Sequence, residues 1–240
     1  MLPDREAVAA AHLIKRLSFI IPTLNEAAGL RGYLEALQRF RKAGHEVILA
    51  DGGSSDNSLQ IATPLVDVIV ESAAGRATQM NSGAAKATGD FLLFLHADTL
   101  LPQQTPSLIA RSLRNGSSWG RFDVRLSGNH PMLRIVERLM NWRSCLTGIA
   151  TGDQAIFMTK ETFQQVGGFP EIALMEDIEI SKRLKRKGRP VCIEIPVITS
   201  SRRWEQGGIL RTIFLMWRIR LAYFFGSTPE QLVSIYRQAR

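Results

Sequence analysis

ATGDFLLFLHADT, at residues 87–99, places a compact run of apolar residues between a glycine turn and a polar end. The apolar part, residues 90–95, has the length and continuous hydrophobicity of a strand that is buried on both faces of a parallel sheet. Gly89 ends the small-residue helix that precedes it, and His96 and Asp98 follow at its carboxyl end. A strand of this kind, directly after a helix, predicts an α/β fold.

The segments on the amino side of this stretch alternate between short apolar runs and amphipathic patterns. We predict strands there at residues 17–21, 46–50 and 66–70. Helices are predicted between them at residues 26–42, 54–62 and 77–87. Because parallel strands need crossover connections, this order predicts a mostly parallel sheet that is flanked by helices and has right-handed crossovers.

The carboxyl half is less regular, and no linker separates it from the first half. Strands are predicted at residues 119–126, 155–158 and 190–195. Helices are predicted at residues 131–143 and 178–187, followed by two terminal amphipathic helices at residues 209–225 and 229–238. We therefore expect one folded unit with an extension at residues 1–16, an α/β domain at residues 17–204 and a helical appendage at residues 205–240.

The formal net charge of +8 indicates an anionic partner such as a phosphate or a lipid surface. Basic residues concentrate at residues 182–189, at Arg202 and Arg203, and in the last helices. This distribution fits phosphate contacts and a membrane-facing patch, and no recognition motif for nucleic acid is present. The helix at residues 209–225 is apolar and carries arginines, so it suits either a membrane surface or ordinary packing, including a homodimer contact.

Targeting and redox signals are sparse. Residues 1–16 carry Asp4 and Glu6 and lack the apolar core of a signal peptide, and no run of about 18 apolar residues predicts a transmembrane helix. Cys145 and Cys192 form no paired motif, so neither a zinc site nor a disulfide framework is expected. A reducing, cytoplasmic compartment is the simplest interpretation, with peripheral contact to the inner face of the membrane left open.

Three polar clusters follow predicted strands, at residues 23–26, 51–56 and 96–98. The carboxyl ends of parallel strands meet at one edge of the sheet, and ligands bind there in open α/β sheets. The loop at residues 51–56 (DGGSSD) has glycines that let backbone approach an anion, and Asp51 suits a hydrogen bond from a base ring. The alternative is a plain turn between a strand and a helix.

Asp98 is the main candidate ligand for a metal ion. Mg²⁺ and Mn²⁺ take one or two protein carboxylates together with substrate phosphates, and Asp98 ends a buried strand where a diphosphate would bind. His96 lies two positions earlier, on the same strand face, and is a candidate second ligand. The alternatives are that Asp98 caps a loop and that His96 is structural, since these ions prefer oxygen.

Further candidates come from other predicted loops and helix ends. Glu176 and Asp177 begin a basic helix and suit either general-base chemistry or favourable contact with the helix dipole. Contacts with the nucleotide, or with the leaving diphosphate and the acceptor, are expected of Arg76, Gln79, Asn81, Arg202, Arg203 and Trp204.

These motifs, in this order, closely resemble the family 2 glycosyltransferases of the GT-A (Rossmann-like) fold. The resemblance covers residues 17–204 and rests on SFIIPTLNE, ADGGSSDNS, ATGDFLLFLHADT, GGFPE and MED. The finer pattern GRATQMNSGA, FLHADT, TGDQAIF and SRRWEQGG is similar to a bacterial subgroup, the radical-SAM/selenodomain-associated transferase 2 group.

The resemblance implies an inverting hexosyltransferase that moves a sugar from a nucleotide-diphosphate sugar, usually a UDP-sugar, with Mn²⁺ or Mg²⁺ held by Asp98. It implies Asp177 as the base, with Glu176 beside it. Residues assigned by motif to the nucleotide-sugar pocket are Pro22, Thr23, Asn25, Glu26, Asp51, Arg76, Asn81, Ala97 and Asp98. Residues assigned to the acceptor or diphosphate are Gly152, Asp153, Arg202, Arg203 and Trp204.

Two departures from the family pattern shape these expectations. The usual Asp-x-Asp metal motif reads His96-Ala97-Asp98, and the Gln-x-x-Arg-Trp signature of processive enzymes is only partly echoed by residues 202–204. We therefore expect transfer of a single sugar to a hydroxyl or lipid acceptor. The rival functions are a sugar-phosphate nucleotidyltransferase, which the glycine-poor loop at residues 22–26 disfavours, and a non-catalytic nucleotide-sugar-binding protein.

Overall fold

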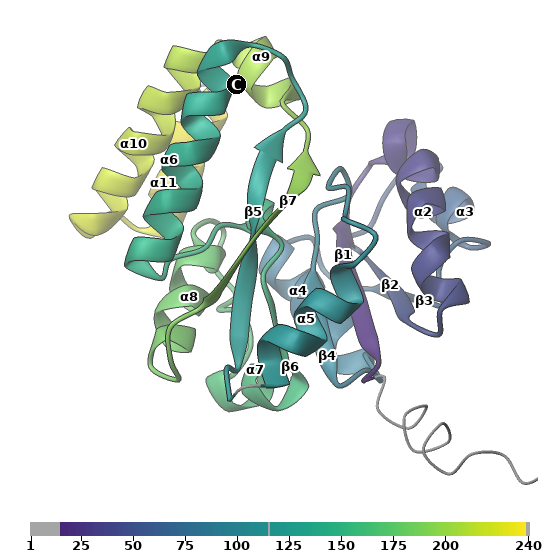
Figure 1. The fold of residues 1–240 in the computed structure, drawn as a ribbon. Helices are drawn as coiled ribbons and strands as arrows, with labels where there is room; N and C mark the ends of the chain where they lie inside the picture. Colours follow the sequence, from purple (N-terminus) through teal and green to yellow (C-terminus); the bar gives the residue numbers. More distant parts are fainter. Residues whose placement is uncertain (1–14, 115, 239–240) are drawn as a thin grey trace, which may run out of the picture.

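The computed structural model describes residues 15–114 and 116–238 (Figure 1). Within them, a sheet of seven strands in the order β3-β2-β1-β4-β6-β5-β7 is covered by helices on both faces. This arrangement confirms the predicted α/β class. The predicted extension at residues 1–16 falls outside the described residues except for Lys15 and Arg16.

The first half of the chain builds the parallel half of the sheet, whose strands are β3 (Val68–Glu71), β2 (Glu46–Asp51), β1 (Leu17–Thr23) and β4 (Phe91–Phe94). Thr23 is the register partner of Asp51, so β1 and β2 end side by side. The loops that follow the parallel strands therefore leave the sheet at a common edge, as the sequence predicts.

The second half adds β6 (Phe157–Thr159), β5 (Trp119–Leu126) and β7 (Val191–Thr199). β6 is antiparallel to both β4 and β5, whereas β5 and β7 are parallel to each other. β6 is thus the one strand among the described residues that runs against the rest, which confirms the prediction of a mostly parallel sheet.

Alternate residues of the central strands face two separate apolar layers. Phe19 and Ile21 of β1 pack into one layer, and Ile20 packs into the other. The helices are α2 (Ala27–Lys42), α3 (Ser58–Ala62) and α5 (Thr105–Arg114) on the first face, and α4 (Arg76–Lys86), α7 (Lys160–Val166) and α8 (Glu176–Lys185) on the second. Each large apolar side chain buried in this way contributes about 1.5–3 kcal/mol of transfer free energy.

α4 approaches the sheet closely because it carries small residues. A Cβ on Gly83 would lie 2.7 Å from Ile20 Cγ2, which is closer than packed carbon atoms allow. Ala77 and Ala84 are buried on the same helix. The close packing brings α4 within reach of the loops at the carboxyl edge of the sheet.

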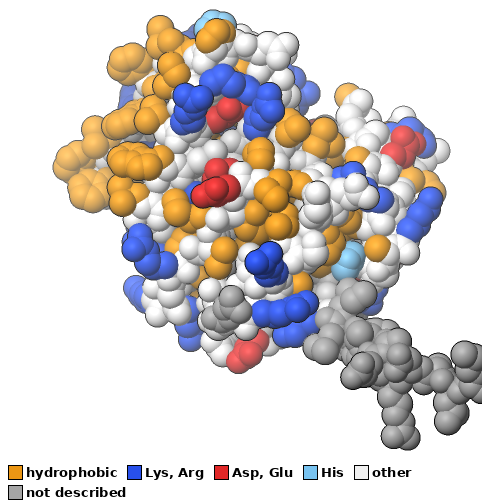
Figure 2. Space-filling view, viewed as in Figure 1, with side chains coloured by type: hydrophobic (Ala, Val, Ile, Leu, Met, Phe, Trp, Pro, Cys, Tyr) orange, Lys and Arg blue, Asp and Glu red, His pale blue; other side chains and the backbone are white. Residues whose placement is uncertain are grey.

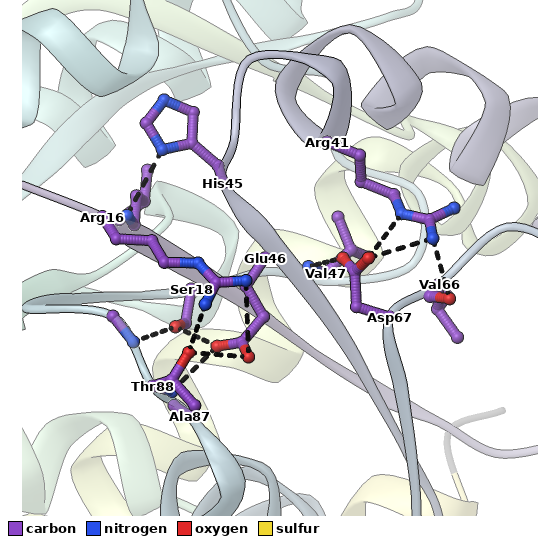
Figure 3. A network of polar contacts seen from close by, with 12 residues as sticks. Arg16, Ser18, Arg41, His45, Glu46, Val47, Val66, Asp67, Ala87 and Thr88 are labelled. Carbon is purple, nitrogen blue, oxygen red and sulfur yellow. Dashed lines mark hydrogen bonds and ion pairs between the residues drawn. The ribbon is translucent and has the colours of Figure 1, made fainter. Parts of the chain in front are cut away.

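A buried polar network holds the opposite, amino edge of the sheet together (Figure 3). Glu46 Oε2 accepts hydrogen bonds from Ser18 Oγ at 2.6 Å and from the Thr88 backbone N at 2.9 Å. His45 Nδ1 accepts a hydrogen bond from the Leu17 backbone N at 3.3 Å. These bonds tie β1, β2 and the segment before β4 to one another, far from the loops that follow the strands.

A cluster of helices covers one end of the sheet: α6 (Pro131–Thr147), α9 (Arg202–Gly207), α10 (Ile209–Phe224) and α11 (Pro229–Gln238) (Figure 1). Leu133 of α6 packs with Trp204 and Ile209, and Met175 packs with Ile219 and Leu232. The terminal helices therefore pack on α6 and on the start of α8. Among the described residues, none of the helices is long and apolar enough to cross a bilayer.

Some predicted elements differ from the structure. α5 was not predicted, although Ile109 and Leu113 lie four positions apart and are both buried. The helix predicted from residue 54 begins only at Ser58, because the residues before it form a hydrogen-bonded loop. Arg202–Gly207 form the short helix α9, which was not predicted.

The expectation about the two cysteines is wrong. Cys145 of α6 and Cys192 of β7 form a disulfide, with their Cα atoms 6.0 Å apart. The packing of α6 on the strands brings together residues that are separated by 47 positions in the sequence, and no local motif announces such a pair. The cysteines therefore no longer argue for a reducing compartment.

Candidate active site

The loops after β1 and β2 are joined by side-chain hydrogen bonds. Asn25 Oδ1 accepts a bond from the Ser55 backbone N at 2.8 Å, and the Asn25 backbone N donates to Ser54 Oγ at 2.9 Å. Asn25 has a φ of 54°, a left-handed conformation that asparagine tolerates better than most residues. The Glu26 backbone N donates to Ser58 Oγ at 2.9 Å, and the Glu26 side chain is exposed.

Asp51 is buried and uses its carboxylate within its own loop. It accepts bonds from the backbone N of Gly53 at 2.9 Å and of Ser54 at 2.8 Å, and from Ser54 Oγ at 2.5 Å. This is the turn-stabilising role that the sequence left open as the alternative. The predicted contact of Asp51 with a base stays a prediction.

Gln79 connects the carboxyl ends of β1 and β2. Its Nε2 donates to the carbonyl oxygens of Thr23 at 2.7 Å and of Ala50 at 2.9 Å. Its amide therefore holds the strand ends that carry the loops. Sequence reasoning grouped Gln79 with candidate nucleotide contacts and missed this positioning role.

His96 and Asp153 form a side-chain hydrogen bond at the carboxyl edge of the sheet. His96 Nδ1 lies 3.0 Å from Asp153 Oδ1, and His96 Nε2 is buried beside Gly152 without a hydrogen-bond partner among the described residues. Burial opposes ionisation of Asp153, but the hydrogen bond and charge of His96, with the charges of Arg76 and Arg203, hold its pKa at about 2. Asp153 is therefore a fixed negative charge that orients the imidazole.

The polar residues of a small pocket come from four separate segments of the chain. Its polar lining consists of Arg76, His96, Gly152, Glu176 and Asp177. Arg76 begins α4, Gly152 begins the 3-10 turn Gly152–Gln154, and the two acids begin α8. These five predicted site residues thus converge, although they span 102 positions of sequence (177 minus 76, plus one).

The two acids in this pocket have different environments. Glu176 is buried, with Oε1 3.7 Å from Arg76 Nη1, and burial together with the neighbouring Asp177 carboxylate raises its pKa. Asp177 is half-buried, and its Oδ2 accepts a bond from the Gly152 backbone N at 3.2 Å. Glu176 therefore retains a proton more readily than an exposed glutamate, and Asp177 is the more exposed of the two carboxylates.

Asp98 lies apart from the lining of this pocket. It is exposed, and its contact with Thr199 Oγ1 is long, at 3.4 Å. It also lies within electrostatic range of Tyr33, whose pKa is raised by burial and by the charge of Asp98. The lone pairs of this carboxylate are therefore available to a ligand.

The donor set fits a metal ion that is held by one carboxylate and by substrate phosphates, because Asp98 is the type of ligand that Mg²⁺ and Mn²⁺ take singly. Within the described part of the chain, no group of three or more His, Cys, Asp or Glu side chains could hold a metal ion. The argument that His96 and Asp98 share a strand face fails, because β4 ends at Phe94. Ligation by His96 stays a prediction.

Other predicted residues are placed as follows. Asn81 uses its amide twice, accepting from the Phe169 backbone N at 2.9 Å and donating to the Phe169 carbonyl at 2.8 Å, and so holds the loop before α8.

Arg203 stacks over the Tyr236 ring at 5.0 Å, and Trp204 packs against the core of the helical cluster. Among the other predicted site residues, Arg202 is exposed, Pro22 is partly buried and Thr23 is buried. Ala97 packs against the main core.

Two arginines near the site were not predicted. Burial and the charge of Arg220 lower the pKa of Arg143 to about 10, while Asp177 opposes this shift. Burial also lowers the pKa of Arg220, against the charges of Asp177 and Asp153. Arg143 lies on α6 and Arg220 on α10, so only the packing of these helices brings them to the acids. The available signal was the presence of arginines in two apolar helices, three in each.

The carboxyl edge of the sheet thus has a glycine-containing loop at residues 51–56 that suits an anion, and the exposed carboxylate of Asp98. It also has the pair of carboxylates Glu176 and Asp177, with arginines nearby. An open α/β sheet with these groups at the carboxyl ends of its strands defines a nucleotide-binding domain of the GT-A type. The chain belongs to the family described as "Glycosyl transferase family 2", whose model matches residues 18–162. The match ends before Glu176 and Asp177, so their placement rests on the structure alone.

Curated relatives carry related names. The chain is 21% identical over 256 aligned positions to the poly-beta-1,6-N-acetyl-D-glucosamine synthase of Staphylococcus aureus (strain COL), covering 92% of this chain and 62% of that protein. A segment is 41% identical over 91 positions to a PGL/p-HBAD biosynthesis glycosyltransferase of Mycobacterium bovis (strain BCG / Pasteur 1173P2), covering 35% and 36% of the two chains. The chain therefore spans less than two thirds of the length of these relatives.

Solved structures share the fold. S. aureus TarS, residues 1–349, matches with a TM-score of 0.62 at 18% identity, over 82% of this chain and 64% of that one. The mannosyltransferase PcManGT from Pyrobaculum calidifontis, in complex with GDP-Man and Mn²⁺, matches with a TM-score of 0.62 at 18% identity, over 94% and 70% of the two chains. At this level of identity the likeness establishes the fold.

Proposed function

We propose that this chain transfers a single sugar from a nucleotide-diphosphate sugar, most simply a UDP-sugar, to a hydroxyl or lipid acceptor with inversion at the anomeric carbon. The observation that carries the proposal is the convergence of Arg76, His96, Gly152, Glu176 and Asp177 on one pocket at the carboxyl edge of a GT-A sheet. A TarS structure in complex with UDP-GlcNAc and the PcManGT complex with GDP-Man lend support from the same fold.

In this proposal Asp177 is the general base. The acceptor oxygen loses its proton to the Asp177 carboxylate and attacks the anomeric carbon, while the bond from that carbon to the diphosphate oxygen breaks. The nucleoside diphosphate leaves with the electron pair. Glu176, buried and paired with Arg76, supports the position of Arg76 at the start of α4.

A divalent ion, Mn²⁺ or Mg²⁺, would be held by Asp98 and would supply charge stabilisation for the leaving diphosphate. Asp98 is exposed and its carboxylate is nearly free of protein contacts, which suits this role. The half-buried Arg143 and Arg220 add positive charge on the side of Asp177. The predicted donor contacts of Pro22, Thr23, Asn25, Glu26, Asp51, Asn81 and Ala97 belong to the same proposal, as do the acceptor contacts of Asp153 and residues 202–204.

The setting of the reaction is a further part of the proposal. A lipid acceptor and a cytoplasmic location at the inner face of the membrane agree with the basic, apolar terminal helices. A homodimer would use the same exposed apolar side chains. Family membership does not favour the rival nucleotidyltransferase, which would release pyrophosphate from a nucleoside triphosphate and a sugar phosphate.

A thermal-shift panel of nucleotide sugars, each with and without Mn²⁺, tests the proposal. A donor that binds the native state raises the melting temperature, and we expect one UDP-sugar to do so more strongly with Mn²⁺. Asp98→Asn should abolish the Mn²⁺-dependent part of the shift, whereas Glu35→Gln, an exposed residue of α2, should leave it intact. No shift with any nucleotide sugar would refute donor binding.

A further inference from the structure

Two neighbouring helices expose long apolar stripes to solvent. On each helix the exposed side chains recur every three or four positions, so they lie along one face. The stripe of α6 consists of Ile135, Leu139, Trp142 and Leu146, and the stripe of α10 consists of Leu210, Phe214, Trp217, Leu221 and Phe224. We call these nine side chains the α6–α10 face.

The two stripes form a single surface because the inner sides of the helices pack together. Leu133 and Val136 of α6 share one apolar cluster with Ile209 and Ile213 of α10. Figure 1 shows the helices side by side, and Figure 2 shows apolar side chains gathered over the same region. The exposure is large: Phe214 is 76% exposed and Trp217 is 73% exposed. The sequence had suggested only the second of these helices as a contact surface.

The exposed charged side chains of these two helices are of one sign. Arg138 lies beside the α6 stripe, and Arg211 and Arg218 lie beside the α10 stripe, all three exposed. α10 contains no acidic residue, and the one acidic residue of α6, Glu137, is buried, with its Oε1 accepting a bond from the Leu126 backbone N. The two helices therefore combine apolar bulk, two tryptophans and arginines, with no exposed acid of their own.

We propose that the α6–α10 face docks on an anionic lipid bilayer. Tryptophan and phenylalanine side chains favour the boundary between headgroups and acyl chains, and arginines beside them attract anionic headgroups. A second copy of this chain fits less well, because a twofold contact would set this arginine-bearing face against an identical face that carries the same charge.

Docking in this orientation would connect the bilayer with the candidate active site. Arg143 and Arg220 lie on the same two helices and are within electrostatic range of Asp177. A lipid-borne acceptor would therefore meet the proposed base close to the docked surface. This consequence rests on the proposed function, whereas the docking itself does not.

Flotation of the full chain with lipid vesicles tests the docking. We expect it to float with vesicles of phosphatidylcholine and phosphatidylglycerol at 3:1, and at least tenfold less with phosphatidylcholine alone. Trp142→Ser/Phe214→Ser/Trp217→Ser should reduce the anionic-vesicle partition at least tenfold. Ile195→Ser, which removes an exposed apolar side chain of β7 outside the face, is the matched control and should float like the parent chain.

A variant that removes two arginines distinguishes lipid docking from self-association. Arg211→Gln/Arg218→Gln should weaken flotation with anionic vesicles while leaving the mass in solution unchanged by light scattering. The proposal is overturned if the parent chain does not float with anionic vesicles, or if the triple serine variant floats equally well. A dimer that the triple variant dissociates, without vesicle binding by the parent, would assign the face to a second copy instead. Melting curves with UDP and Mn²⁺ report donor binding separately, so failure of docking and failure of the proposed reaction are distinguishable.

Discussion

His96 Nδ1 lies 3.0 Å from Asp153 Oδ1, so the histidine that follows β4 is paired with an acid from a different loop. His96 follows β4, and Asp153 belongs to the turn before β6. A negative charge thus lies beside His96 at this edge of the sheet, and it is supplied by another segment. The bond also fixes which imidazole nitrogen faces Gly152.

The hydrogen bond between His96 and Asp153 should be coupled to activity. Asp153→Asn removes the charge that orients His96, and His96→Asn removes the imidazole, so each should lower kcat/KM by about tenfold or more. The kcat/KM of the double variant should be no lower than that of the less active single variant, because both substitutions break the same interaction. Steady-state kinetics with melting curves checks this. Additive losses would show that the two residues act independently.

Gly152 should not tolerate a side chain. A Cβ at this position would collide with the His96 ring, and the Gly152 backbone N also donates to Asp177. Gly152→Ala should therefore lower both activity and the free energy of unfolding, the latter by about 1–3 kcal/mol. Gly29→Ala on α2 is the control, because a Cβ at this position would have no atom within 4 Å. This substitution should stabilise the helix by about 0.5–1 kcal/mol. An active, fully stable Gly152→Ala would contradict this packing.

His45 should make the stability depend on pH. Burial, aided by the charge of Arg16, lowers the pKa of His45 in the folded chain below its unfolded value of about 6.5. The unfolded state then binds more protons, so the stability contribution is complete above about pH 6.5 and is lost as the pH falls toward the folded pKa. The free energy of unfolding, measured by urea titration at several pH values between about 5 and 8, should rise less steeply with pH in His45→Asn than in the parent chain. An equally steep rise with pH in His45→Asn would exclude His45 as the source of the pH dependence.

The disulfide should stabilise the packing of α6 on β7. It closes a loop with a sequence separation of 47, for which we expect about 2–4 kcal/mol of stabilisation. Cys145→Ser/Cys192→Ser should lose this amount in denaturant titrations, and a reductant should bring the parent chain to the same value. If the reductant leaves the parent chain unaffected, the two thiols are not joined.

Local pattern predicted much of the fold. The bounds of β5 and α11 agree with the predicted ranges, because β5 is bounded by turn residues and α11 begins at Pro229. The prediction missed α5, whose signal was a short helix start at Thr105 and Pro106 with two buried apolar residues. The disulfide, like the pairing of β5 with β7, joins distant segments, and no local pattern encodes it.

The candidate site was predictable where it follows strands and was not where it depends on packing. Arg76, Glu176 and Asp177 were named from motif and position, and the structure brings them together. Arg143 and Arg220 were missed because they reach the acids only through the packing of α6 and α10. The hydrogen bond between His96 and Asp153 was missed because each residue was considered within its own segment.

The most direct test of the proposed site is the rate at which Asp177→Asn releases nucleoside diphosphate from the donor that the thermal-shift panel identifies. Loss of a general base should lower kcat by about 10²–10⁴-fold, while the donor Kd from calorimetry stays close to that of the parent chain. Glu35→Gln serves as the control for a lost surface carboxylate and should keep the parent kcat. An Asp177→Asn chain that turns over its donor at the parent rate would contradict the assignment of this pocket as the active site.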